Sequence, residues 1–474
     1  MRRQLPLALA FALAAGCTMT EPDLSVLDRA DLAQSHVAPA KGAQRAPPLA
    51  TSKKLTVDEA VRIALVNNPE IGQAIARVRQ AEANIKRARA AFLPSVDAQA
   101  SWTKWYESNS GVSMPEGLFE MPAGANIVRN DRLYTGQIGA SWNLFAGGRD
   151  LQNYRSARDA RRARSLLSKR VGEVIDDAVR QAFYQALLAR DAITIGEASV
   201  AFSSRELKDA KARYEVGRGL KTDVLTFETR RLAAQVGVTV AQNSHRLARI
   251  ALSELMAIAL GEDIELAMPA EAATRWEKMH PEQVAQQAFG SRADLAAARK
   301  SYAVAKRQVK AAQADFYPRL DASAAYGAKR QNSTHLRSQD DELTVGAAVS
   351  WNLYRGGDTV AAVAAARHAA TETAEQFRQL KLRIRTQVGN ALANIKTARE
   401  RVGLAEKTVA TAEETLRLLT ERYRAGAITI SQVTEGELRL TEARLDLIKA
   451  KIDLLTAQSE LSLALGEKEN APGR

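Results

Sequence analysis

The chain has 474 residues, with 67 lysines and arginines against 54 aspartates and glutamates, and a single cysteine. Its hydrophobic fraction of 46% excludes a mainly disordered chain, and the single cysteine excludes an internal disulfide and a metal site built from several cysteines. The mean hydropathy of −0.26 is too low for a bundle of membrane helices, and the scattered histidines give no local ligand pair, so we expect no metal and no cofactor.

The N-terminus has the features of an export signal. Arg2 and Arg3 precede an apolar run over residues 5–15, which is too short to span a bilayer and ends in small residues. We therefore predict a signal peptide over residues 1–16. The segment that ends at Cys17 resembles the cleavage site of a bacterial lipoprotein, which implies that Cys17 becomes the first mature residue and carries acyl chains. A signal peptide without lipidation is the alternative.

Residues 17–54 combine several prolines with small and polar residues, a composition that favours a tether over a folded domain. The sequence that follows contains an internal duplication. GASWNLFAGG at 139–148 returns as AVSWNLYRGG at 348–357, and the later motif RYEVG returns as RYRAG at the same offset of 209 residues. We predict a lipidated tether, two repeats and a short tail, with these bounds: 17–54, 55–268, 269–466 and 467–474.

Four segments of the duplicated part alternate apolar residues with small or polar ones. Such a period of two predicts strands, and this pattern is typical of strands in an outer-membrane β-barrel. An antiparallel sheet on a soluble core is the alternative. The predicted strands cover about 94–106, 133–144, 318–329 and 342–353. Aromatic residues in or beside them favour a membrane-interface girdle, and they are Trp102, Trp105, Tyr134, Trp142, Tyr326 and Trp351.

Each half also contains a long proline-free stretch. A helix over such a stretch would extend roughly 100 Å at about 1.5 Å per residue. Apolar and small residues step alternately by four and three, as Ala398, Val402, Ala405 do, which predicts coiled-coil packing. We predict two antiparallel helical hairpins, at 148–261 and 357–466.

Four strands are too few to close a barrel, since the smallest membrane barrels have about eight. Open strand edges in lipid would leave backbone groups without hydrogen bonds. We therefore expect a mixed α and β protein that shares its strands with other copies of itself.

The chain resembles the TolC family of outer-membrane channel proteins over nearly all of 55–466. The resemblance is carried by NNPEI at 67–71, FLPSVD and FYPRLD, WNLFAGG and WNLYRGG, and the paired RYxxG turns. Ala293 departs from the proline that the family often has there. The resemblance implies a homotrimer with a twelve-stranded outer-membrane barrel and a periplasmic helical tunnel. It also implies partners at the far end of the tunnel, namely a periplasmic adaptor and an inner-membrane ABC or proton-driven transporter.

The resemblance also implies site residues near the two hairpin turns. The turns should lie at the tunnel mouth and bind the adaptor, through Arg213, Tyr214, Gly217, Arg422, Tyr423 and Gly426. Family members carry acidic residues after the second turn that line the tunnel constriction. The corresponding residues are Gln432 and Glu435, so one usual carboxylate is absent. Asp223 matches Gln432 in the first repeat, and an N-cap of the returning helix is its alternative role.

The positive charge is spread along the predicted helices, often with acids nearby, which argues against binding of nucleic acid. No phosphate loop or nucleophile motif indicates an enzyme. We expect an exit duct for efflux or one-step protein secretion. The sequence features that bear on the choice between these two kinds of cargo disagree with one another. The alternative is a periplasmic coiled-coil adaptor or a structural lipoprotein, which would not explain the four strands.

Overall fold

The computed structural model describes residues 54–105, 132–261, 263–269, 279–331 and 341–466, with the side chain of Gln331 excepted. The predicted signal peptide, Cys17, nearly all of the tether and the C-terminal tail lie outside the described residues. All described elements belong to one compact unit, Thr51–Arg474.

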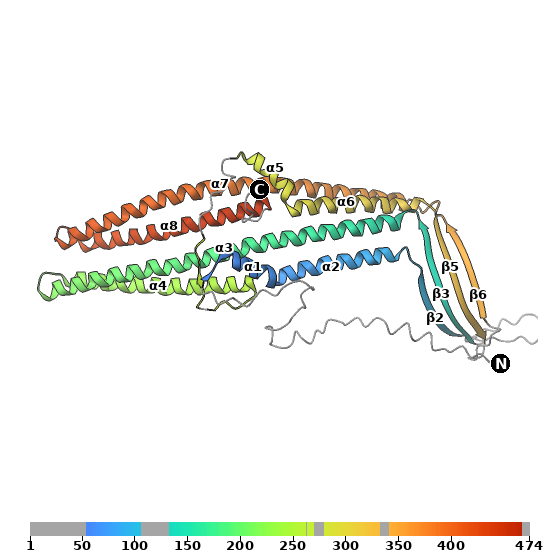
Figure 1. The fold of residues 1–474 in the computed structure, drawn as a ribbon, viewed down its shortest axis with the longest axis horizontal. Coiled ribbons are helices and arrows are strands. Elements are labelled where there is room, and N and C mark those ends of the chain that lie inside the picture. Colours follow the sequence, from blue (N-terminus) through green and yellow to red (C-terminus); the bar gives the residue numbers. More distant parts are fainter. Residues whose placement is uncertain (1–53, 106–131, 262, 270–278, 332–340, 467–474) are drawn as a thin grey trace, which may run out of the picture. The chain divides into compact units, whose positions relative to one another are not determined.

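The described elements follow the same order in the two halves of the chain (Figure 1). The first half contains β1 (Lys54–Leu55), α1 (Val57–Asn67), α2 (Pro69–Ala90), β2 (Ser95–Lys104), β3 (Arg132–Ala146), α3 (Arg149–Glu215) and α4 (Lys221–Met256). The second contains β4 (Glu265–Leu266), α5 (Pro281–Ser291), α6 (Ala293–Gln313), the 3-10 turn η5 (Ala314–Phe316), β5 (Arg319–Gln331), β6 (Asp341–Ser350), α7 (Asp358–Arg424) and α8 (Ile430–Leu465).

The predicted helical hairpins are present, and their lengths agree between the halves. Both α3 and α7 have 67 residues, and both α4 and α8 have 36. The starting residues 149 and 358 differ by 209, as do 221 and 430. One predicted boundary is wrong at a site residue, because β6 ends at Ser350 and Trp351 lies outside the strand that was expected to contain it.

Local sequence explains where these helices begin. Thr56 forms a capping box with Glu59 at the start of α1, and Asn68 caps α2 with Pro69 at its first position. The corresponding residue before α6 is Arg292, whose backbone angles of −66° and 123° are close to the −63° and 127° of Asn68. The departure from proline at Ala293 therefore leaves this turn unchanged. A pair of left-handed glycines precedes both α3 and α7, where a strand passes directly into a helix.

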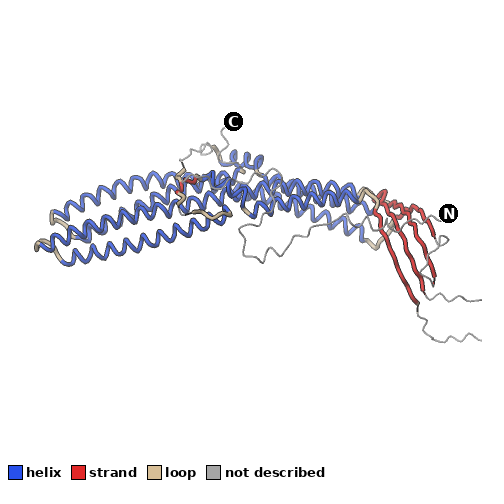
Figure 2. The backbone as a smooth tube through the Cα atoms, turned by 60° about the horizontal axis from the view of Figure 1, so that its bottom comes forward, coloured by secondary structure: helices blue, strands red, loops and turns tan. Residues whose placement is uncertain are grey.

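The four long strands, labelled in Figure 1 and drawn in red in Figure 2, form one antiparallel sheet in the order β2-β3-β5-β6. Its two hairpins share one register, since Ser95 pairs with Ser141 and the corresponding Arg319 pairs with Ser350. Directly opposed residues share a face of a sheet, so the pairings place Val96, Ile138, Ala324 and their apolar neighbours on one face. The opposite face carries Asp97, Gln137, Ser323 and other small or polar residues. Within the described residues, β2 and β6 have no partner on their outer edges.

The long helices bury their apolar positions against one another. Helix α3 packs against α4, α2, α6 and α8, while α7 packs against α8, α6 and α5 (Figure 1). One core joins the middle of α7 to α5, α6 and α8, and includes Ile384, Val388, Ile395 and Leu454. None of the helices in the described part of the chain combines the length and the apolar character that a membrane span requires.

Candidate functional site at the hairpin turns

The two hairpin turns have the same backbone structure. Gly217 and Gly426 adopt φ values of 71° and 75°, in the left-handed region that favours glycine. The N–H of Arg218 donates to the Arg213 carbonyl at 2.8 Å, and the N–H of Ala427 donates to the Arg422 carbonyl at 2.9 Å. Each long helix therefore ends in a Schellman motif, whose glycine allows the chain to reverse direction.

Behind the turns, the two hairpins share one apolar cluster, which we call the hairpin-end core. It consists of Leu207, Ala210, Phe227, Leu416, Tyr423, Val433 and Leu440, and so draws on all four long helices. Tyr423 is 7% exposed, and its ring meets that of Phe227 edge-on at 6.1 Å. The Arg213 guanidinium lies 5.1 Å from the centre of the Tyr423 ring.

The Tyr423 hydroxyl connects one hairpin to the other. It donates a hydrogen bond of 2.8 Å to the carboxylate of Asp223 at the start of α4. Burial, together with this hydrogen bond and the charge of Asp223, raises the pKa of Tyr423 above its ordinary value of 10. The end of α7 is also bound to α3, because Arg424 Nη2 lies 2.7 Å from the buried Glu206 carboxylate.

The predicted constriction residues do not form one cluster in this chain. Asp223 binds Tyr423, whereas Gln432 and Glu435 lie on an exposed side of α8. Glu435 accepts from Arg439 at 2.6 Å. The alternative role of Asp223 as an N-cap is wrong, because Leu220 occupies the N-cap position and no side chain caps this helix.

The structure adds a buried polar cluster that the sequence patterns missed. Glu437 is only 3% exposed, and its carboxylate accepts hydrogen bonds from Ser199 on α3, Arg230 on α4 and Thr441 on α8. The Arg230 Nε to Glu437 Oε2 distance is 2.8 Å. A buried carboxylate needs this number of donors to offset its lost hydration. The only sequence signal of this cluster was an acidic residue, Glu437, among the apolar coiled-coil positions of α8.

The six aromatic residues assigned to a girdle are not in a single row. Trp102 pairs with Tyr134 on the apolar face, and Trp105 follows the end of β2, at the end of the sheet farther from the helices. Tyr326 lies between Ile138 and Leu343 in the register, and its hydroxyl donates to Asp341 at 2.7 Å.

Trp142 and Trp351 lie at the end of the sheet nearer the helices. The Trp142 indole donates to the Phe92 carbonyl at 3.0 Å, and the Trp351 indole donates to the Phe316 carbonyl at the same distance. These bonds tie the end of each strand pair to the chain just before the first strand of the same pair. Both rings remain exposed, at 44% and 58%, so they can also contact lipid.

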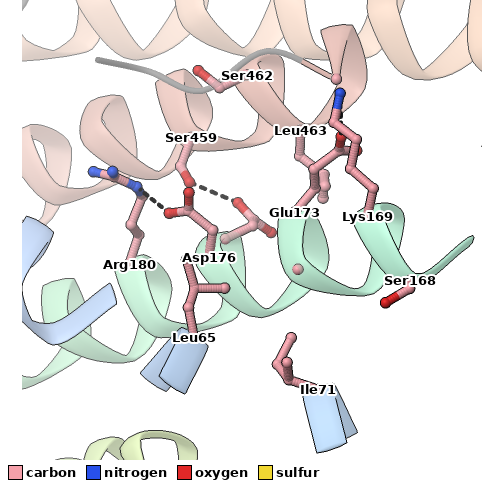
Figure 3. Close-up of a pocket in the computed structure, with 13 residues that line it drawn as sticks. Leu65, Ile71, Ser168, Lys169, Glu173, Asp176, Arg180, Ser459, Ser462 and Leu463 are labelled. Carbon is pink, nitrogen blue, oxygen red and sulfur yellow. Dashed lines mark hydrogen bonds and ion pairs between the residues drawn. The ribbon is translucent and has the colours of Figure 1, made fainter. Parts of the chain in front are cut away.

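A cavity of about 370 Å³ lies between α1, the middle of α3 and the end of α8 (Figure 3). Its polar lining is occupied by contacts between side chains. Arg180 donates to Asp58 of α1 at 2.8 Å, Ser459 of α8 donates to Asp177 of α3 at 2.7 Å, and burial raises the pKa of Asp177. The cavity residues therefore join helices to one another. Within the described residues, no three His, Cys, Asp or Glu side chains gather as metal ligands would.

The sequence and the fold of this chain are similar to those of known proteins. The family model described as outer membrane efflux protein matches residues 60–257 and 284–467. The pyoverdine export outer membrane protein OpmQ of Pseudomonas aeruginosa is 25% identical over 393 residues, which are 81% of this chain and 79% of that protein. The alkaline protease secretion protein AprF of the same species is 29% identical over 200 residues, or 40% of each chain. The solved structure of the outer membrane protein VceC of Vibrio cholerae has a TM-score of 0.71 to this chain at 21% identity, over 87% of this chain and 96% of that one, and shows the same fold.

Proposed function

The chain belongs to the outer membrane efflux protein family, and on this basis we propose that it is the outer-membrane exit duct of a tripartite export system. In such a system, an inner-membrane transporter and a periplasmic adaptor deliver cargo to the duct, which releases it outside the cell. This role replaces the alternative of a periplasmic adaptor or structural lipoprotein. The single observation that carries it is a sheet with one largely apolar face, whose charged residues are confined to the end farther from the helices, joined directly to helices of 67 residues. One face suits lipid, and each helix extends about 100 Å away from the sheet.

We infer that three copies form the duct, each supplying four strands to a barrel of twelve. The two halves of the chain act as repeats in this assembly, so that contacts between halves recur between subunits. Within one chain, β3 pairs with β5, with Ala140 opposite Ala324. The residues corresponding to these two are Val349 in β6 and Ala100 in β2. Their pairing across the subunit boundary would satisfy both open edges and keep the apolar residues on one face.

The hairpins of three subunits would then form the periplasmic tunnel, with the Schellman turns at its mouth. The exposed turn residues are available to an adaptor. The left-handed glycine at each turn has no side chain that would hinder the adaptor from approaching the backbone. Gln432 and Glu435 project from the exposed side of α8 and would line the constriction. The Tyr423–Asp223 hydrogen bond would restrain the separation of the two hairpins at that point. Cys17 would add a lipid anchor.

The relatives do not select one cargo, because OpmQ is named for pyoverdine export and AprF for alkaline protease secretion. The duct itself can be tested without knowing the cargo. The protein extracted from outer membranes should migrate as a heat-sensitive trimer on electrophoresis. Added to a planar lipid bilayer, it should produce stepwise ion conductance. A monomer without conductance would contradict the proposal, and it is the result that an adaptor or structural lipoprotein would give.

A further inference from the structure

The equal spacing of the two hairpins allows a subunit contact to be worked out residue by residue. Every position of α3 and α4 has a counterpart 209 residues later in α7 and α8, as the starting residues 149 and 358 show. Within the chain, α3 packs along α8. The corresponding contact would join α7 to α4. These two helices meet within the chain near the hairpin turns, where Tyr423 bonds to Asp223, but Leu404 and Thr408 farther along α7 are exposed, so the corresponding contact there is not made within one chain. It requires a second copy, so this inference rests on the proposed trimer.

The polar cluster around Glu437 has a counterpart of the same chemistry. Glu437 corresponds to Glu228, Arg230 corresponds to Arg439, and Ser199 corresponds to Thr408. The acid, the base and the Ser199 hydroxyl are therefore retained in the second set, whereas Thr441 of the first set corresponds to Leu232. In the first set they meet inside one chain, where the Glu437 side chain is 4% exposed and the Arg230 side chain is 24% exposed.

The second set is open in the single chain. The Arg439 side chain is 71% exposed, and within the described part of the chain its one ion pair is with Glu435, on its own helix. Glu228 is half-buried, and its carboxylate has no hydrogen-bond or ion-pair partner among the described residues. Thr408 is exposed and donates to the Leu404 carbonyl of its own helix. All three are thus available to groups from another chain.

Other corresponding positions along the same helices differ in exposure in the same direction. Ile195 of α3 is 8% exposed, whereas its counterpart Leu404 of α7 is 65% exposed. Ser459 of α8 is 2% exposed, whereas its counterpart Ile250 of α4 is 57% exposed. Helix α4 carries a stripe of exposed apolar side chains at helical spacing, formed by Leu225, Leu232, Val236, Val240, Leu247 and Ile250. A stripe of this size in water indicates a surface that is covered in the assembled protein.

We propose that α7 and the start of α8 of one subunit cover α4 of the next, and that Arg439 pairs with Glu228 of the partner subunit. Thr408 contributes the hydroxyl that Ser199 contributes within the chain. The contact is heterologous, since the two surfaces differ, and three copies close it into a ring. Arg439 has enough donors to hold Glu435 at the same time.

Charge reversal tests the pair in the full-length trimer. Glu228→Arg would set two guanidinium groups against each other at the interface, and Arg439→Glu would set two carboxylates against each other. We expect each single variant to lose the heat-sensitive trimer band seen on electrophoresis, and the double variant to regain it. A double variant with no more trimer than the single variants would overturn the proposed pair. If the wild-type chain formed no trimer, the proposed function itself would fail.

Cross-linking gives a second test that does not depend on loss of assembly. A short bismaleimide reagent should join Glu228→Cys and Arg439→Cys between subunits and give a ladder of dimers and trimers under denaturing conditions. The matched control is Glu413→Cys with Arg444→Cys, an exposed pair within one chain whose side chains meet at 2.6 Å. The control should give only monomers. A monomer-only result for the first pair, with the control cross-linked as expected, would overturn the inference.

Discussion

Tyr214 and Tyr423 occupy the same place in the two RYxxG motifs, yet they have different environments. Tyr423 is 7% exposed and bonded to Asp223, while Tyr214 is 47% exposed. Tyr423 packs against the neighbouring hairpin and bonds to Asp223 there, whereas Tyr214 and Gln432, the counterpart of Asp223, are both exposed. The motif alone predicted the turns, but it could not show which tyrosine is buried, since burial depends on the neighbouring hairpin.

Tyr423→Phe should loosen the hairpin ends. It removes the only hydroxyl that bonds to Asp223 across the hairpins in the described residues, a loss of about 1 kcal/mol. We expect a lower denaturation midpoint and a larger conductance in planar bilayers. Tyr214→Phe is the matched control and should change neither quantity. Equal behaviour of the two variants would contradict the assignment of Tyr423 as the restraint.

Because the pKa of Tyr423 is raised in the folded protein, the stability of the fold should depend on pH in a direction that can be stated. Because the folded state holds this proton more tightly than the unfolded state, the contribution to stability is complete below pH 10, the ordinary tyrosine pKa. It is lost as the pH rises through the higher folded value. Denaturation midpoints of the wild type should therefore fall above pH 10 more steeply than those of Tyr423→Phe. Parallel curves for the two proteins would contradict this account.

At the scale of the elements, hydropathy period and turn residues predicted most of the fold. The long hairpins and all four strands lie close to the expected bounds, because a period of two and a period of 3.5 are both strong over these lengths. The exceptions depend on contacts between elements. Trp351 lies beyond β6, where its indole bonds to the Phe316 carbonyl, and Glu437 is buried among three helices. Neither contact leaves a periodic trace in the sequence.

Glycine substitutions should have opposite effects at the turn and inside a helix. Gly426→Ala places a side chain on a left-handed residue and should cost about 1 kcal/mol of the free energy of unfolding, although no atom blocks the new group. Gly403→Ala lies inside α7, where the space is also open, and should stabilise by about 0.5–1 kcal/mol. Chemical denaturation of both variants gives the two signs. A stabilising Gly426→Ala would contradict the left-handed turn.

At the scale of the whole molecule, the register of the sheet predicts where subunits meet. In a Cys17→Ala background, Ala100→Cys and Val349→Cys should form a disulfide between subunits, because opposed residues have Cβ atoms about 5 Å apart. Val349 lies in β6, whose outer edge has no partner within the described residues, and so it is free to pair. The control combines Ala100→Cys with Ala348→Cys, whose side chain lies on the opposite face. Non-reducing electrophoresis should show the disulfide only for the first pair, and cross-linking in both would contradict the proposed register.

The lipid anchor is a separate prediction, because Cys17 lies outside the described residues. Metabolic labelling with a radioactive fatty acid should mark the wild type and leave Cys17→Ala unlabelled. The unlabelled variant should still form the trimer in the outer-membrane fraction, since the sheet supplies its own apolar face. An unlabelled wild type would show that the signal peptide is cleaved without lipidation.

The matched lengths of the paired helices restrict how this chain can change over time. Helices α3 and α7 both have 67 residues, and their turns must reach the same level for neighbouring hairpins to meet. An insertion of seven residues in only one of them would displace its turn by about 10 Å along the axis and set its seam against the wrong partners. Viable insertions or deletions in these helices should therefore occur in compensating pairs, one in each half of the gene.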